Sequence, residues 1–316
     1  GFAFLNMLQL IGWTSIMIYD AMLALQELAP LSPMIWTIAI GTLVILWLFI
    51  GLHNTGYIQA IVSVLLLGLT LYMGAHMIWQ WPSEATLLSS GNMSFIAALE
   101  LSIAMPLSWL PLISDYTRES KNPVSASLTS ATVYTITSIV MYTLGLSAAI
   151  FGGGDSIITI MMNAGLGLAG LIVIIFSTVT TTFMDAYSAG VSSTTIYNGA
   201  SSKGVAVVVT MVGTIAAILY PMDDITDFLY LIGSVFAPMI AILLADYFIN
   251  RQQVQTISAY LVRGLIWSLS VGLYHYMLHS ESTIGATLPA FTMAFVVTAI
   301  VGFISKTAHT SAEIKQ

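Results

Sequence analysis

The 316-residue chain contains no cysteine and little charge: seven Lys and Arg and 14 Asp and Glu, together 7% of the residues. Without cysteine, disulfide bonds and thiolate metal sites are excluded. A soluble domain carries about a quarter charged residues, and a nucleic-acid surface needs a basic patch, so neither class fits. The chain instead has 58% hydrophobic residues and a mean hydropathy of +0.93. This composition indicates a protein embedded in the lipid bilayer.

Long apolar runs recur along the whole chain, and each is long enough to cross a hydrocarbon core about 30 Å thick as an α-helix. Period-two alternation, the mark of β-barrel strands, is not seen. The sequence therefore predicts an all-α polytopic membrane protein with ten transmembrane helices. The runs lie near residues 2–26, 34–52, 56–78, 93–115, 125–151, 165–189, 203–220, 225–248, 257–278 and 287–305.

Basic residues orient these helices because Lys and Arg concentrate in cytoplasmic loops. They follow the fourth, sixth, eighth and tenth runs, as Arg118, Lys121, Lys203, Arg251, Lys306 and Lys315, while the "LHNTG" turn after the second run is uncharged. Arg263 lies just inside the ninth run and can extend its side chain to the same membrane face. The pattern predicts a multi-pass protein of the cell (inner or plasma) membrane with both ends of this chain in the cytoplasm.

The fourth run contains the unusual stretch "MPLSWLPLISDYTRESKNP". Pro106 and Pro111 each remove a backbone donor, which predicts a kinked or unwound helix near the bilayer centre. Such a break is tolerated where it lines a polar cavity, so Pro106 and Trp109 are candidate substrate contacts; a kink that only shapes packing is the alternative. Asp115 and Arg118 close this helix and are candidates for interfacial anchoring or a gate salt bridge.

Hydroxyl groups crowd the middle of the sixth run, "IIFSTVTTTFMDAYSAG". Ser177, Thr180 and Thr181 offer the oxygen ligands that a hard cation such as Na⁺ takes, although such hydroxyls also bond to their own helix carbonyls. Asp185 lies one turn further on. An intramembrane carboxylate is costly and usually faces a pathway or a partner, so Asp185 is a candidate site residue.

The first run places Asn6, Gln9 and Trp13 on one helical face. An indole face with an amide nearby suits a flat hydrogen-bonding heterocycle, because stacking contributes about 1–3 kcal/mol per base. The alternative is that the amides join neighbouring helices and Trp13 is a packing residue. In the eighth run, Asp246 is a candidate gate group, with interfacial placement as the alternative.

Other function classes fit less well. The string "MDDITD" at residues 222–227 resembles an Asp-rich diphosphate motif of membrane prenyltransferases, but it occurs once and on the predicted non-cytoplasmic side. A channel needs a continuous pore rather than broken helices. An amino-acid symporter of the same architecture is the main alternative transporter.

"PLSWLPLISDYTRES" resembles the nucleobase-cation symporter family, which includes cytosine permeases, and most closely its hydroxymethylpyrimidine (thiamine precursor) transporter branch. Three further segments support the resemblance: "LQLIGWTSIMIYDA", "TTTFMDAYSAGVSS" and "GSVFAPMIAILLADYFINR". The resemblance covers essentially the whole chain. It implies a transporter rather than an enzyme, with no catalytic residue and no cofactor beyond a coupling ion.

The family resemblance implies one transmembrane domain over residues 1–316 with an inverted repeat and alternating access. The ten helices would be helices three to twelve of twelve, with the first pair absent. Residues 1–78 would be the remainder of the first repeat, 93–248 the second repeat, and 257–305 two accessory helices.

The resemblance also assigns roles to particular residues. Trp13 matches a stacking aromatic, and Thr180 and Thr181 match hydroxyls that help to hold the cation. Gln9 or Asn6 would supply an amide contact that some relatives place at the position of Met17. Some relatives carry a second stacking tryptophan near Pro106, where Trp109 is the candidate replacement. Asp185 lies where relatives often have asparagine, which would change the coupling ion from Na⁺ to H⁺. The sequence thus predicts an importer of a pyrimidine-type compound driven by Na⁺ or H⁺.

Overall fold

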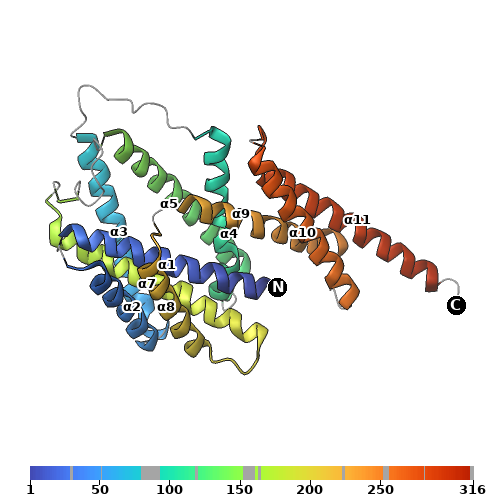
Figure 1. The fold of residues 1–316 in the computed structure, drawn as a ribbon, viewed down its shortest axis with the longest axis horizontal. Coiled ribbons are helices and arrows are strands. Elements are labelled where there is room, and N and C mark those ends of the chain that lie inside the picture. The colour runs from blue at the N-terminus through green and yellow to red at the C-terminus, as the bar shows by residue number, and fades with distance from the viewer. Residues whose placement is uncertain are drawn as a thin grey trace. The chain divides into compact units, whose positions relative to one another are not determined.

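The computed structural model describes residues 1–28, 31–50, 52–79, 93–117, 120–151, 161–162, 165–222, 225–251, 256–280 and 282–313. Within these ranges the chain is helical and contains no strand (Figure 1). The first helices are α1 (Phe2–Leu28), α2 (Pro33–Ile50), α3 (Leu52–Trp79), α4 (Phe95–Thr117) and α5 (Pro123–Phe151). The later ones are α7 (Gly167–Ile196), α8 (Ser202–Leu219), α9 (Ile225–Leu244) with its π-helical extension η1 (Ala245–Asn250), α10 (Ile257–His279) and α11 (Thr287–Glu313).

Ten spans in the described part of the chain are long and apolar enough to cross a membrane, which confirms the predicted all-α polytopic fold. Their ends follow local chemistry. Pro33 and Pro123 begin α2 and α5, where a missing N–H costs nothing. Ser201 and Thr256 cap α8 and α10 by accepting backbone N–H bonds through their hydroxyls.

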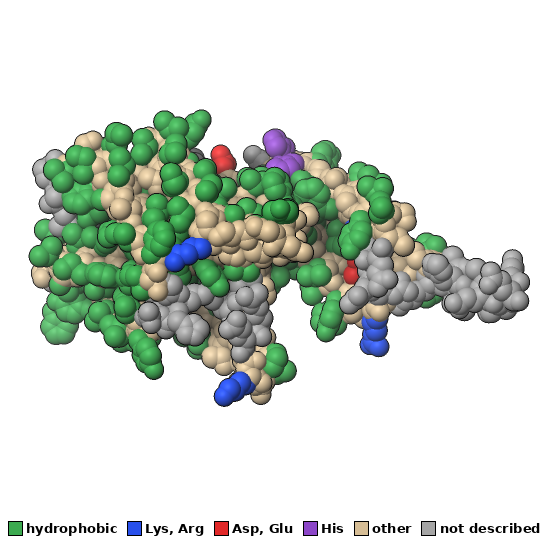
Figure 2. Space-filling view, turned by 90° about the horizontal axis from the view of Figure 1, so that it is seen from below, with side chains coloured by type: hydrophobic (Ala, Val, Ile, Leu, Met, Phe, Trp, Pro, Cys, Tyr) green, Lys and Arg blue, Asp and Glu red, His purple; other side chains and the backbone are tan. Residues whose placement is uncertain are grey.

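Hydrophobic side chains cover most of the face shown in Figure 2, and charged side chains are few there. Large apolar residues are exposed on several helices, for example Phe95 at 79% and Ile139 at 60%. A soluble protein does not leave this much apolar surface in water. These side chains therefore face lipid, and the backbone groups beneath them are paired within each helix.

The chain forms two compact units, each described here by itself. The first contains residues 1–91 and 112–224, and the second contains residues 92–111 and 225–316. The division passes through α4, between Pro111 and Leu112.

Helices α1, α2, α7 and α8 form the centre of the first unit, and all six pairs among them are in contact. Close approach between helices depends on small residues. A Cβ at Gly213 of α8 would lie 2.6 Å from Thr14 Cγ2 of α1, and a Cβ at Gly190 of α7 would lie 2.1 Å from the Ser202 carbonyl oxygen. Helix α3 packs against α7 and α5.

The backbone of α4 remains helical through both Pro106 and Pro111. Of the two predicted outcomes, a kinked or an unwound helix, unwinding is therefore wrong for this structure, whereas a kink stays a prediction. Each proline removes one N–H donor, while neighbouring residues keep helical geometry and Ser108 donates its hydroxyl to the Met105 carbonyl at 2.7 Å. The interruption is a loss of hydrogen bonds rather than a change of secondary structure.

The second unit is built from α9, η1, α10, α11 and the first part of α4. Trp267 of α10 donates its indole N–H to the Val235 carbonyl of α9 at 2.9 Å. Asn250 of η1 donates to the Thr298 carbonyl of α11 at 3.1 Å. Polar bonds therefore join α9 and its extension to both later helices.

Candidate functional site

A buried amide network joins α1 to α7 in the first unit. Gln9 donates to the Asn6 side-chain oxygen at 2.7 Å, and Asn6 donates to the Ser192 hydroxyl at 2.9 Å. Asn6 and Gln9 are 1% and 5% exposed. Sequence reasoning chose the two amides but missed Ser192, because the sixth run was predicted to end at residue 189 whereas α7 continues to Ile196. The alternative reading of the amides, as links between helices, describes these contacts.

Helices α1 and α7 run antiparallel along this interface. Leu10 of α1 packs in one cluster with Ala189 of α7, and Leu25 further along α1 packs in another with Leu171, which is earlier in α7. Residue numbers thus rise along α1 as they fall along α7. This alignment fixes which residues of the two helices lie at the same height.

Trp13 and Asp185 lie at the same height on this interface. Trp13 is seven residues after Asn6, and Asp185 is seven residues before Ser192, the hydrogen-bonded partner of Asn6. Seven residues of α-helix make about two turns and rise about 10.5 Å, so each residue keeps the face of its starting point. Both residues therefore lie about two turns from the same hydrogen bond, on the helix faces that this bond joins.

Asp185 is 8% exposed and makes no hydrogen bond or ion pair with any described residue. Water hydrates a carboxylate far better than an apolar interior does, so burial without a partner is costly. Such a group is stabilised by binding a proton, a cation or a ligand donor. Asp185 has the properties of a binding group rather than a packing group.

The hydroxyl groups around the predicted cation site on α7 differ in whether they already form a hydrogen bond. Thr180 is buried and donates to the Ser177 carbonyl at 3.0 Å, which is the helix-bonding alternative for this residue. Thr181 is half-buried. Thr182 is fully buried and its hydroxyl bonds to nothing in the described part of the chain. A cation site on this turn of α7 stays a prediction, and Thr182 is a further oxygen that it would use.

Pro106 and Trp109 belong to the second unit, with Pro106 exposed and Trp109 half-buried. Their pairing with Trp13 and Asp185 stays a prediction. Asp115 lies in the last turn of α4, but its side chain and Arg118 are outside the described residues, so the proposed gate salt bridge is not described. Residues 223 and 224 of the Asp-rich string are also outside them.

Asp246, a predicted gate or interfacial residue, has partners inside the second unit. Arg263 binds it through Nε at 3.1 Å and Nη2 at 2.9 Å, and Asn250 donates to it at 2.8 Å. The side chains of Asp246 and Arg263 are only 15% and 16% exposed. Arg263 thereby joins α10 to η1, and its predicted extension to the membrane face stays a prediction.

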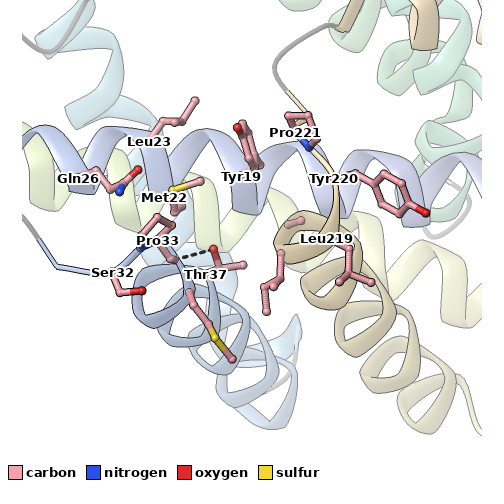
Figure 3. Close-up of a pocket in the computed structure, with 13 residues that line it drawn as sticks. Tyr19, Met22, Leu23, Gln26, Ser32, Pro33, Thr37, Leu219, Tyr220 and Pro221 are labelled. Atoms are coloured by element: carbon pink, nitrogen blue, oxygen red, sulfur yellow. Dashed lines mark hydrogen bonds between the residues drawn. The ribbon is translucent and has the colours of Figure 1, made fainter.

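A separate pocket of about 390 Å³ lies where the end of α1, the start of α2 and the end of α8 meet (Figure 3). It is lined by uncharged residues, among them Tyr19, Gln26, Thr37 and Tyr220. The Thr37 hydroxyl is already bonded to the Pro33 carbonyl. None of the predicted site residues lines this pocket, so it is distinct from the Trp13 and Asp185 region.

Comparison with known proteins shows to which family this chain belongs. Residues 3–314 match the family described as permeases for cytosine/purines, uracil, thiamine and allantoin. The chain belongs to this family. The family resemblance read from "PLSWLPLISDYTRES" and the three supporting segments is thereby confirmed.

Two curated relatives are cytosine permeases of Escherichia coli, from strain K12 and from O157:H7. Each is 25% identical over 175 residues, which is 55% of this chain and 41% of the permease. The match thus spans less than half the length of these relatives.

A solved structure, that of Mhp1, a nucleobase-cation-symport-1 family transporter in a closed conformation with bromovinylhydantoin bound, has the same fold. The TM-score is 0.76, with 16% identity, and the alignment covers 96% of this chain and 76% of Mhp1. The chain is thus a multi-pass membrane protein with a transporter fold.

Proposed function

We propose that this chain forms most of the transport domain of a secondary active importer for a pyrimidine-type compound such as hydroxymethylpyrimidine or a nucleobase. One observation carries the proposal: a buried carboxylate without a partner among the described residues, Asp185, at the height of the Trp13 indole. Family membership supports the substrate class, since cytosine, purines and thiamine appear in the family's description. Alternating access would carry the compound across the bilayer.

The pair of groups suits an aminopyrimidine. An indole face stacks on a flat ring, and stacking is worth about 1–3 kcal/mol. A protonated carboxyl offers one donor and one acceptor, which match a ring nitrogen and its neighbouring amino group. Hydroxymethylpyrimidine and cytosine both present such an edge. Trp109 of α4 is the proposed second aromatic contact, and Pro106 lies beside it in the sequence.

An amino-acid substrate is less well supported. Its carboxylate would need a cation or the N-terminus of a helix. Helices α1 and α7 contain no Lys or Arg, and Arg263 lies in the other unit, bound to Asp246. These two helices therefore offer no side-chain cation to a substrate carboxylate, which favours a neutral heterocycle over an anion.

The coupling ion is Na⁺ or H⁺ in this proposal, and two groups on α7 would bind them. A proton would bind Asp185, whereas Na⁺ would take oxygens near Ser177, Thr180 and Thr181, together with Thr182.

The basic residues support placing both chain ends in the cytoplasm. One of them, Lys203 of α8, lies 4.6 Å from the ring centroid of Phe49, which places the start of α8 beside the end of α2.

The test is uptake by the full-length protein in proteoliposomes. Labelled hydroxymethylpyrimidine, cytosine and an amino acid are compared under separately imposed Na⁺ and H⁺ gradients. We expect saturable pyrimidine uptake that is lost in Trp13→Ala. The matched control is Trp79→Ala, since Trp79 is 91% exposed at the end of α3. Loss of proton dependence in Asp185→Asn assigns H⁺, and loss of Na⁺ dependence in Thr181→Ala assigns Na⁺. Amino-acid uptake without pyrimidine uptake would contradict the substrate assignment.

A further inference from the structure

The first half of α4 is bonded to the start of α11 through one buried side chain, Glu100. A single carboxylate oxygen of Glu100 accepts the backbone N–H of Ala286 and, at 2.6 Å, that of Thr287. Glu100 is 7% exposed. The first N–H groups of a helix have no partner within it, and the positive end of the helix dipole stabilises an anion there. Glu100 therefore supplies the hydrogen-bond acceptor and the negative charge that the N–H groups at the start of α11 lack within their own helix.

The turn before α11 is shaped to admit this carboxylate. Gly285 has φ +75, a conformation that residues with a side chain rarely adopt. A Cβ at this position would lie 2.6 Å from Glu100 Oε1 and 2.9 Å from its carboxyl carbon. Both the backbone conformation and the close approach require glycine here.

The start of α11 is in turn held by α10 and α9. Tyr274 of α10 is 1% exposed and packs in one cluster with Ala286, which directly precedes α11, and with Ala290 of α11. Its hydroxyl would be 2.8 Å from a Cβ placed on Gly233 of α9. The partner of Glu100 is thus a fixed part of the second unit.

The inner face of α4 is a stripe of Glu100, Ala104 and Ser108, which are buried at four-residue spacing. Glu100 is the charged member of the stripe, and its carboxylate accepts two backbone N–H groups at the start of α11. Six residues further on, Pro106 weakens the helix by removing a backbone donor. The orientation of this part of α4 therefore depends on where Glu100 is held.

We propose that Glu100 is a positioning residue of the transport cycle. It fixes the half of α4 that carries Pro106 and Trp109 to the start of α11, so α10 and α11 hold a part of the substrate-handling machinery in place. This role rests on the proposed transport function but names helices outside the predicted repeats as contributors to it.

Two substitutions remove the bond from opposite sides. Glu100→Ala deletes the acceptor, and Gly285→Ala displaces it without changing any charge. We expect each to lower the maximal uptake rate about tenfold, which corresponds to about 1.4 kcal/mol, with the substrate KM changed less than about twofold. The control is Gly264→Ala in α10, where a Cβ would meet nothing within 4 Å. Glu100→Gln keeps an acceptor oxygen and the side-chain volume, and we expect it to retain most of the activity.

Hydrogen exchange at the amides of Ala286 and Thr287 shows whether the bond itself is lost. We expect faster exchange there in Glu100→Ala and Gly285→Ala and no change in Gly264→Ala. Uptake at wild-type rate in a variant whose amides exchange faster would overturn the positioning role. The amount of folded protein is measured for every variant. The role would also be overturned if the maximal uptake rate fell only in proportion to the loss of folded protein, and did so in Glu100→Gln as well.

A covalent replacement gives the sharpest test. A Cβ at Gly285 would lie 3.1 Å from Ile96 Cγ2, so these two positions are the pair chosen for an engineered disulfide. The chain has no cysteine of its own to interfere. We expect Gly285→Cys alone to be impaired and the oxidised Ile96→Cys/Gly285→Cys pair to regain uptake. Recovery only after reduction would show that α4 and α11 must separate, which contradicts the proposal. The uptake rate of each variant is divided by that of the wild type, using whichever solute the wild type transports. A wrong substrate assignment is thereby distinguished from a wrong role for Glu100.

Discussion

The two units differ in how they surround three carboxylates of membrane-spanning helices, of which Glu100 and Asp185 are buried and Asp246 is half-buried. In the second unit, Glu100 accepts two backbone N–H groups and Asp246 binds Arg263 and Asn250. In the first unit, Asp185 has no such partner among the described residues. The two satisfied carboxylates join helices. Asp185, the carboxylate without such a partner, joins no helices. The free-energy cost of burying it is explained if a proton, a cation or a substrate binds it.

The largest expected effect comes from breaking the Asp246 and Arg263 pair. Asp246→Ala leaves the half-buried Arg263 without its counter-charge and without two charge-assisted hydrogen bonds, which destabilises by about 3 kcal/mol. The measurement is thermal unfolding in detergent. An Asp246→Leu/Arg263→Met double variant removes both charges and is expected to be more stable than Asp246→Ala. A double variant that unfolds at the same temperature as the single one would show that the charge pair is not the cause.

The packing beside that pair should be nearly as sensitive. A Cβ at Gly302 of α11 would lie 2.0 Å from the amide carbon of Asn250, so Gly302→Ala forces the Asp246 partner out of place. We expect a loss of about 1–3 kcal/mol in the same unfolding assay. Gly272→Ala is the control because a Cβ there meets nothing. Equal unfolding temperatures for the two alanine variants would contradict this account.

The amide network of the first unit should show a smaller loss. Asn6→Ala leaves Ser192 and Gln9 without their common partner, which costs about 1–2 kcal/mol. A double-mutant cycle with Ser192→Ala measures the share of the direct bond. Additive effects of the two substitutions would mean that the 2.9 Å contact contributes little.

Asp185→Asn should give the smallest change in stability and the opposite sign. Replacing an unpartnered carboxylate with a neutral amide removes a desolvation cost, so the unfolding temperature should stay level or rise, while ion-dependent uptake is lost. A variant as unstable as Asp246→Ala would show that Asp185 is a structural group. It would remove the contrast between the two units.

Sequence reasoning located the helices because crossing a bilayer demands length and apolarity, which are local properties of the chain. It placed the end of α7 too early, since "VSSTTI" is polar yet stays helical against α1. It also predicted a kink or unwinding at Pro106 and Pro111, and unwinding is wrong because the remaining helical bonds hold the backbone.

The site was harder to predict because partners on other helices decide what a polar residue does. Trp13 and Asp185 were recognised as residues, but their common height follows only from the Asn6 and Ser192 bond. Thr180 offered two readings, and its bond to the Ser177 carbonyl is visible only in the structure. The pairing of Asp246 with Arg263 depends on how η1 and α10 pack, which no local pattern specifies.

The bond from Glu100 to the start of α11 also bears on the order in which this protein is made. The two partners are 186 residues apart in the sequence. At a synthesis rate of about 5–20 residues per second, Glu100 would wait roughly 10–40 seconds for α11 to emerge. During that time an acidic side chain sits in a membrane-spanning segment without its partner. Helix α11 therefore completes a segment made much earlier, and a ribosome that stops short of residue 286 leaves Glu100 of α4 without this partner.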